Sequence, residues 1–261
     1  MNRALWWVSD AWVMTLRNLR RIPRQPDIIV FGIVQPILFI VLFRYVFGGA
    51  MSSAPGVSSG NYAQFLMPGI FVQTVVFGAV ASAAIGIAED MQKGLMDRFR
   101  SLPMSRSSVL LGRTASDTVR NALTVAVMVA VGMLVGFRFE GSALGAAAGV
   151  GLMLLFGVAL SWVAVLIGLS VGSVEAAQSA GMIWLFPLTF ASSAFVPAQT
   201  MPGWLQVFVE HNPVTVVVES LRALFNGTAI GSAGWQTMAW IVGLFVVFLP
   251  LSVAKFRRAN G

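Results

Sequence analysis

The feature that most constrains this chain is a series of long apolar runs that contain no charged side chain. No Asp, Glu, Lys or Arg occurs between Gly141 and Val174, and none occurs between Ala176 and Val209. An α-helix needs about 20 consecutive apolar residues to cross a bilayer, and in lipid only a helix or a closed barrel satisfies every backbone polar group. Only 10% of the residues are charged, whereas soluble domains have roughly 25%. The sequence therefore indicates a helical membrane protein.

The apolar runs predict one all-α polytopic domain, residues 1–261, with six transmembrane helices. We place the spans at about 28–48, 65–88, 118–137, 143–171, 176–196 and 236–254. A tight turn at Gly172, Ser173 and Glu175 separates the fourth span from the fifth. The first run is longer than the roughly 7–15 apolar residues of a signal peptide, so we expect it to remain as an anchor.

The basic residues predict the orientation, because Lys and Arg concentrate in short cytoplasmic loops. With six spans, 14 of the 17 Lys and Arg residues lie on one side. Five precede the first span, six lie between the second span and the first turn of the third, and three follow the last. Segment 49–64 has none and is expected outside. We predict a multi-pass protein of the cell (plasma) membrane with both termini cytoplasmic.

Two segments outside the spans have helical patterns of their own. Residues 3–24 place apolar and basic side chains on opposite helical faces, which predicts an interfacial helix on the cytoplasmic leaflet, in contact with lipid. Residues 204–225 contain two apolar halves, each too short to cross alone. Asn212 and Pro213 separate these halves, and Pro is favoured at the first position of a helix. We expect two short re-entrant helices before span six.

Four ionisable residues belong to this re-entrant segment. Glu210 and His211 lie at its break, where a polar turn at the interface is the simpler interpretation and a proton relay is the alternative. Glu219 and Arg222 are three residues apart, the spacing of a local ion pair on one helix.

Motifs for catalysis are absent from the sequence. It has no cysteine, one histidine, no G-x-x-x-x-G-K-[ST] phosphate loop and no His-Glu-x-x-His helix. We therefore expect a transport subunit with no enzyme activity, no catalytic residue, and no cofactor or metal of its own. The net charge is +7, but the basic residues adjoin apolar runs and form no separate basic domain, so nucleic acid is not an expected partner.

Uncharged polar residues inside the spans offer candidates for substrate contact. They either line a translocation cavity or bond across helices, and they are Gln35, Gln73, Thr74 and Gln178. Spans without fixed charge suit an amphipathic or lipid-like substrate better than a small ion. The patterns GAAAG at 145–149 and GLSVG at 168–172 allow close helix approach, either within the chain or between subunits.

The segment EDMQKGLMDRFRSLPMSR, residues 89–106, crowds charges between the second and third spans. Met91, Leu95, Phe99 and Leu102 recur at helical spacing and form one apolar stripe, and Pro103 ends the pattern. An ordinary cytoplasmic loop needs only basic residues. The stripe and the interspersed acidic residues favour a short helix over 89–102 that docks to another protein.

This segment resembles the signature E-x-x-x-G-[TL]-[ML]-[DE]-R-[LF]-x-x-[LT]-P-[MV]-S-R of ABC-2 type transporter permeases, particularly exporters of the daunorubicin/doxorubicin-resistance type. It differs at Gln92, where the pattern often has Glu, and at Leu95, where it often has Thr. MPGWLQVFVEHNPVTVVVESLRAL, 201–224, is similar to the stretch before the last span in that family, and VGFRFEGS, 135–142, is similar to the exit of its third span.

The resemblance implies a permease that pairs with a second permease subunit, as a homodimer or a heterodimer, and with separate ATP-binding cassette ATPase subunits that bind ATP and Mg. It implies export of a hydrophobic drug, lipid or natural product by alternating access. An ABC-2 exporter of polysaccharide or glycoconjugate is the alternative, and a secondary transporter is a more distant one. The residues implied in coupling to the ATPase are Glu89, Lys93, Gly94, Leu95, Asp97, Arg98, Phe99 and Pro103.

Overall fold

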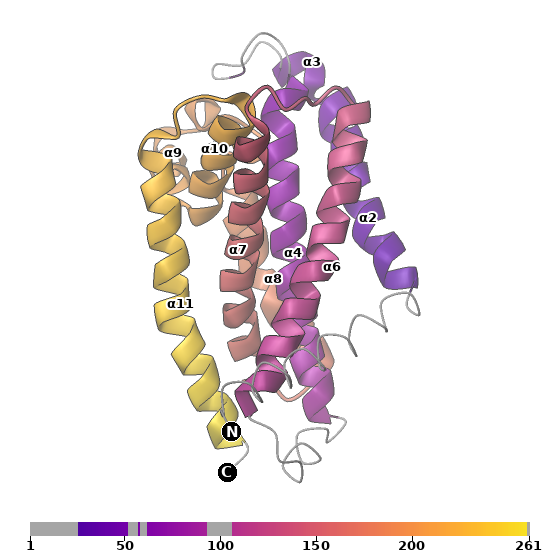
Figure 1. Cartoon of the computed structure of the whole chain (residues 1–261), viewed down its shortest axis with the longest axis vertical. Helices are drawn as coiled ribbons and strands as arrows, with labels where there is room; N and C mark the ends of the chain where they lie inside the picture. The colour runs from indigo at the N-terminus through magenta and orange to yellow at the C-terminus, as the bar shows by residue number, and fades with distance from the viewer. Residues whose placement is uncertain (1–25, 52–56, 58–61, 93–105, 260–261) are drawn as a thin grey trace.

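A computed structural model of the chain describes residues 26–51, 57, 62–92 and 106–259, and all the regular structure within these ranges is helical (Figure 1). The all-α class predicted from the sequence is therefore confirmed for the described residues. The predicted interfacial helix at 3–24 and residues 93–102 of the predicted coupling helix lie outside them.

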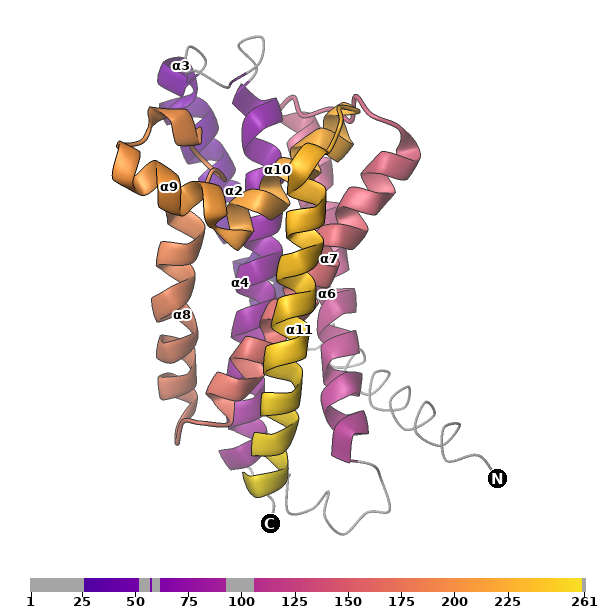
Figure 2. The same ribbon diagram turned by 90° about the vertical axis from the view of Figure 1, so that its left-hand side faces the viewer.

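Six helices run along the long axis and alternate in direction, and shorter helices lie across one end (Figures 1 and 2). The long helices are α2 (Pro26–Val41), α4 (Tyr62–Gln92), α6 (Arg106–Leu134), α7 (Ala143–Gly168), α8 (Val174–Phe190) and α11 (Gly231–Ala259). The short elements are the π-helical turn η2 (Leu42–Val46), α3 (Gly48–Met51), the 3-10 turn η4 (Ala198–Thr200), α9 (Gly203–His211) and α10 (Pro213–Asn226).

Four of these helices are long and apolar enough to cross a membrane. They are Tyr62–Gln92, Thr114–Leu134, Ala143–Gly168 and Gly231–Phe256. The two other predicted spans correspond to shorter helices: α2 and η2 contribute the apolar stretch Ile33–Val46, and α8 has 17 residues. Four helices, and not six, thus meet the length and composition expected of a span among the described residues.

The largest difference from the predicted span bounds is at the end of α8. The fifth span was expected to reach residue 196, but α8 ends at Phe190. Pro187 lies inside its last turn and has no N–H for the helix ladder. The chain then folds back in a turn at 191–197 whose residues Ser192 to Phe195 are buried. Hydrophobicity alone did not reveal this stop, because the turn is buried and lacks charge.

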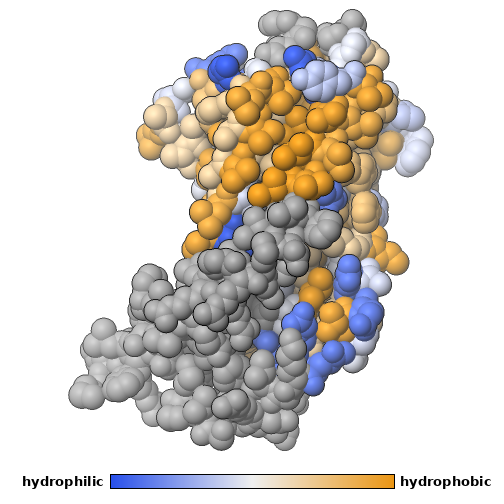
Figure 3. Space-filling model, turned by 90° about the vertical axis from the view of Figure 1, so that its right-hand side faces the viewer, coloured by the Kyte–Doolittle hydropathy of each residue, from blue (hydrophilic) through white to orange (hydrophobic). Residues whose placement is uncertain are grey.

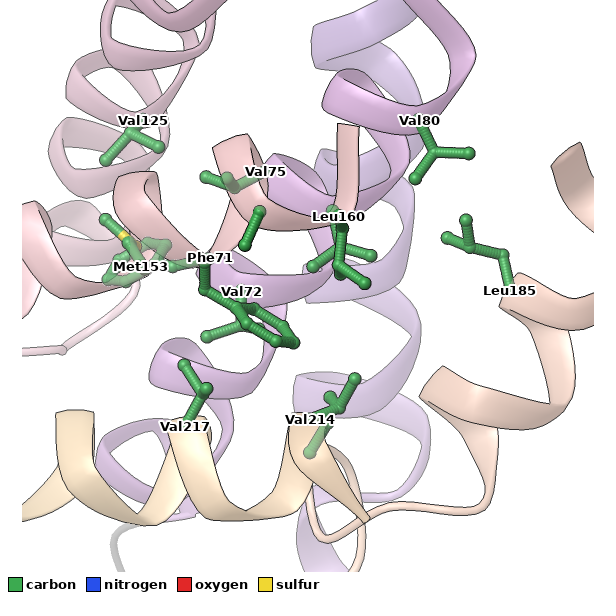
Figure 4. Close-up of a cluster of buried hydrophobic side chains, with 14 of the residues drawn as sticks. Phe71, Val72, Val75, Val80, Val125, Met153, Leu160, Leu185, Val214 and Val217 are labelled. Carbon is green, nitrogen blue, oxygen red and sulfur yellow. The ribbon is translucent and has the colours of Figure 1, made fainter. Parts of the chain in front are cut away.

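Helix α4 forms the centre of the bundle, and its neighbours pack around it. Phe71 and Val75 of α4 lie with Met153 and Leu160 of α7 and Val217 of α10 in one buried cluster (Figure 4). The surface of the bundle, in contrast, has a broad hydrophobic band on the face seen in Figure 3. Soluble monomers rarely expose such patches. A lipid environment removes the unfavourable free energy of exposing these apolar side chains to water.

Glycines allow α7 to approach its neighbours closely. A Cβ atom added at Gly157 would lie 2.5 Å from Val75 Cγ1, and one at Gly168 would lie 2.7 Å from the Ala84 carbonyl oxygen. Gly149 faces the Phe225 ring of α10 in the same way, at 2.5 Å. These small residues therefore pack helices within the chain, which was one of the two roles open at the sequence level.

Candidate functional site

Asn212 joins the end of α8 to the start of α10. Its side-chain oxygen accepts a hydrogen bond from the Val214 N–H at 2.8 Å, which is an N-cap, and Pro213 occupies the first helical position. Its Nδ2 donates to the carbonyl oxygens of Leu188 and Ala191 at 2.8 and 2.7 Å. Carbonyls at a helix C-terminus have no partner within the helix, so one buried amide satisfies both helix ends.

Arg222, ten residues along the chain, is buried at 7% exposure. Its Nε and Nη2 donate to the Phe65 carbonyl oxygen of α4 at 3.0 and 2.9 Å. Nη2 also donates to the Ser193 carbonyl oxygen in the 191–197 turn at 2.8 Å. Nη1 pairs with Glu219 Oε1 at 2.7 Å, as their spacing predicted. One guanidinium thus joins three segments that are distant in the sequence.

The charge of Arg222 is compensated although the group is buried. Desolvation lowers the pKa of its guanidinium, while the neighbouring Glu219 carboxylate raises it. The guanidinium carbon also lies 3.5 Å from the centroid of the Phe65 ring, which is a cation–π contact. Arg stays protonated in proteins, and several charge-assisted bonds offset the loss of hydration.

Further contacts hold the same three segments together. Ser193 donates from its hydroxyl to Glu219 Oε1 at 2.8 Å and from its backbone N–H to Thr215 Oγ1 at 3.0 Å. Tyr62, the first residue of α4, donates from its hydroxyl to the Phe195 carbonyl oxygen at 2.6 Å. We refer to these contacts together with those of Arg222 as the Arg222 junction. It connects the start of α4, the 191–197 turn and α10.

Glu210 and His211 take no part in this junction. Both are exposed at the end of α9. Gln206 donates to Glu210 Oε1 at 3.1 Å, and His211 Nδ1 lies 2.9 Å from the Val207 carbonyl oxygen. Both of these contacts lie within α9.

The four polar residues proposed to line a cavity differ in their surroundings. Gln73 and Thr74 are buried neighbours in α4, and Thr74 Oγ1 donates to the Ile70 carbonyl oxygen of its own helix at 2.8 Å. Gln35 on α2 and Gln178 on α8 are exposed. Burial thus groups the two α4 residues and separates them from the other two.

Two buried nitrogen atoms have no hydrogen-bond partner within the described part of the chain. They are Nε2 of Gln73 and Nε1 of Trp184 on α8. Buried polar groups without a partner are uncommon and require an explanation. Trp184 was not singled out from the sequence, because a Trp inside an apolar run has no distinguishing pattern there.

Of the residues implied in ATPase coupling, Glu89 lies in the last turn of α4. Lys93, Gly94, Leu95, Asp97, Arg98, Phe99 and Pro103 lie outside the described residues. Within the ranges that the structure describes, no group of three or more His, Cys, Asp or Glu is placed to hold a metal ion.

Known proteins match nearly the whole chain. Residues 9–226 match the family model of the ABC-2 type transporter. The chain is 35% identical over 228 residues to the daunorubicin resistance ABC transporter permease protein DrrB1 of Streptomyces coeruleorubidus, with 87% of this chain and 79% of that protein covered. It is 31% identical over 231 residues to the doxorubicin resistance ABC transporter permease protein DrrB of Mycobacterium tuberculosis, with 83% and 78% covered. The family match ends where α10 ends.

Proposed function

We propose that this chain, which belongs to the ABC-2 type transporter family, is the membrane-spanning subunit of an ATP-driven exporter that moves a hydrophobic drug, lipid or natural product outward. The chain is an ABC-2 permease of a family of drug-resistance ABC exporters. The observation that carries the proposal is this family match over 9–226. Relatives named for daunorubicin and doxorubicin resistance favour a drug over a polysaccharide as the substrate.

In this proposal a separate ATPase subunit supplies the energy. The sequence has no phosphate-binding loop, so ATP and Mg would be bound by the cassette partner. The partner would dock on the helix proposed for 89–102, and a second permease subunit would complete the membrane domain. Closure of the ATPase pair would shift a two-state membrane domain by alternating access, because a partner that binds one state better changes the populations of both.

The proposed arrangement has six spans in the cell membrane and both termini in the cytoplasm. The alternating helix directions support it, because α4 ends and α6 begins at the end opposite α9 and α10 (Figures 1 and 2). Most of the Lys and Arg residues lie in the N-terminal segment, in the segment that joins α4 to α6, and at the C-terminal end of the sequence. The proposal places these three segments together in the cytoplasm. Helices α2 and α8 would cross with help from their flanking turns, and α9 and α10 would dip into the outer leaflet.

Replacing Leu95 and Phe99 together with Asp is expected to reduce both co-purification of the cassette ATPase and transport-linked ATP hydrolysis to background. Two unpaired carboxylates in an apolar stripe oppose burial in an interface, because a buried charge without a partner is strongly unfavourable. The measurement is affinity purification of the tagged chain with its partner, followed by an ATPase assay in liposomes.

The matched control for this pair is Ser53→Asp with Ser58→Asp, which adds the same charge to the segment proposed to lie outside. This control should leave co-purification and ATP hydrolysis at the wild-type level. Normal coupling in the Leu95 and Phe99 double variant would show that the 89–102 segment is not the docking helix.

Single cysteines introduced into this cysteine-free chain test the orientation. In intact cells, Ser58→Cys is expected to react with a membrane-impermeant maleimide, whereas Ser107→Cys should react only after the membrane is permeabilised. The reason is that the basic segment preceding Ser107 is retained in the cytoplasm. Labelling in the reverse pattern would overturn the proposed orientation, and labelling of both residues from one side would overturn the six-span count.

A further inference from the structure

The helical winding of the first predicted span changes along its length. Pro26–Val41 is α-helical, whereas Leu42–Val46 forms the π-helical turn η2. Val41 and Phe47, which flank the turn, both keep right-handed helical dihedral angles, so the helix widens there without breaking. A π turn closes its hydrogen bonds between residues five apart instead of four, and such turns are rare and frequently lie at functional sites.

Neither the residues of η2 nor burial in the core accounts for this turn. Leu42–Val46 contains no Gly or Pro, the residues most often found where a helix departs from α geometry, and none of its side chains is fully buried. Pro36 lies inside α2, ahead of η2, and a proline disturbs only the turn that precedes it. The π winding is therefore explained by contacts with other segments.

Those contacts involve three Phe residues spaced four apart. Phe39 and Phe43 are stacked at 6.0 Å between ring centroids, and Phe43 and Phe47 are 5.4 Å apart. An α-helix has 3.6 residues per turn, so a spacing of four rotates the side chain by about 40° at each step. A π turn holds more residues per turn, which keeps Phe47 nearly in line with Phe43. We call Phe39, Phe43 and Phe47 the phenylalanine column.

The phenylalanine column packs against the end of α8 and the turn that follows it. Phe43 is stacked on Phe195 of the 191–197 turn at 4.7 Å between ring centroids. Phe39 reaches Phe195 at 5.9 Å and Phe190 of α8 at 6.0 Å. Aromatic pairs at these distances are favourable, and the Arg222 junction fixes the 191–197 turn to α4 and α10. The packing of the column on a fixed turn therefore stabilises the π winding of η2.

A second winding is available to η2. If the same residues formed an α-helix, about one residue fewer would fit into the turn, and the chain after η2 would rotate by about 100° around the helix axis. Phe47 and α3 follow η2 directly, at the end of the molecule that also holds α9 and α10 (Figure 2), so they would rotate with it. The part of the span before η2 would keep its packing on α4 and α6.

We propose that η2 is a hinge in the first span that switches between π-helical and α-helical winding during the transport cycle. In the π state the phenylalanine column rests on Phe195. In the α state residues 47–51 rotate and Phe47 leaves the column. This inference rests on the proposed export function, because the switch is one element of a membrane domain with two states.

Spin labels on introduced cysteines measure the rotation, because the chain has no cysteine of its own. The full chain is reconstituted in nanodiscs with its cassette ATPase, and pulsed electron paramagnetic resonance gives the distances without nucleotide and with ATP plus vanadate. The pair Ala50→Cys with Leu144→Cys reports on α3, after η2. The control pair Leu38→Cys with Leu144→Cys reports on α2, before η2. All three positions are exposed.

The distance between labels at 50 and 144 is expected to change by roughly 5 Å between the two conditions, because a rotation of about 100° carries a side chain across much of a helix about 10–12 Å wide. The distance between labels at 38 and 144 should change by less than about 2 Å, since the chain before η2 does not rotate.

Removing one ring should shift the same equilibrium without nucleotide. Phe43→Leu and Phe195→Leu keep apolar volume but lose the stacked pair, so each should raise the fraction of molecules with the second distance about five-fold. Phe139→Leu is the matched control. It removes a ring that packs on Phe225 of α10 at 5.0 Å between centroids, and it should leave the distances unchanged.

The outcomes separate the hinge from the function on which it rests. A wild-type complex that hydrolyses no ATP and exports no hydrophobic compound would overturn the proposed function. In an active complex, an unchanged distance between 50 and 144, or equal changes in both pairs, would overturn the hinge alone. The same conclusion follows if neither Phe43→Leu nor Phe195→Leu shifts the distances, and each variant serves if the other fails to fold.

Discussion

Replacing Arg222 with Leu is expected to lower the melting temperature of the purified protein by roughly 10 °C. Leu fills similar apolar space but supplies no donor to the carbonyl oxygens of Phe65 and Ser193, and it leaves Glu219 without its counter-ion. Removing one partner of a buried ion pair costs about 3–5 kcal/mol. The measurement is thermal unfolding in detergent followed by intrinsic tryptophan fluorescence.

Arg120 provides a matched control, because it forms an ion pair of the same i,i+3 spacing with Asp117. That pair is 3.6 Å apart and its side chains are 25% and 19% exposed. Arg120→Leu should change the free energy of unfolding by about 1 kcal/mol or less. The loss of stability in Arg222→Lys should be smaller than in Arg222→Leu and larger than in Arg120→Leu, because Lys keeps the charge but lacks the planar fork of donors. Equal melting shifts for Arg222→Leu and Arg120→Leu would contradict the role assigned to the Arg222 junction.

Replacing Gly69 with Ala is expected to have the second large effect. The added Cβ would lie 2.1 Å from the Ala194 carbonyl oxygen and within 3 Å of two further backbone atoms of that residue. Backbone atoms have no rotamer by which to move aside, so the 191–197 turn must shift away from α4. We expect a loss of about 3 kcal/mol, at the upper end of overpacking effects, and a lower yield of folded protein in gel filtration.

Gly151→Ala in α7 is the control for Gly69→Ala. A Cβ at Gly151 meets no atom within 4 Å, and Ala is favoured over Gly in a helix by about 1 kcal/mol, so this variant should be unchanged or more stable. Combining Gly69→Ala with Arg222→Leu should cost less than the sum of the two, because both disturb the same turn. Full additivity would mean that Gly69 and Arg222 act independently.

Local sequence signals predicted several elements closely. Asn212 and Pro213 predicted a break between two short helices, and α9 and α10 meet there because the cap and the fixed proline dihedral act within a few residues. The chain also turns between Gly168 and Val174, near the predicted turn, where Ser173 caps α8. The spacing of Glu219 and Arg222 predicted their ion pair. In each case the relevant interaction is between neighbours in the chain.

Other features depend on residues that are distant in the sequence. The end of α8 at Phe190 is six residues earlier than predicted, since the turn that follows it is stabilised by α4 and α10. Gln35 and Gln178 were grouped with Gln73 because all are polar residues in apolar runs, yet only Gln73 is buried. Periodicity describes one helix at a time, so it does not show which faces of two helices meet.

The sequence by itself determined that this protein is a helical membrane protein of the ABC-2 type, because long uncharged runs and ordered family motifs are properties of the chain alone. Only the tertiary structure decided what Arg222 does. The same i,i+3 spacing forms a partly exposed pair at Asp117 and Arg120 and a buried junction at Glu219 and Arg222. The difference comes from the Phe65 and Ser193 carbonyl oxygens, which are brought within reach of the guanidinium only when α4, the 191–197 turn and α10 pack together.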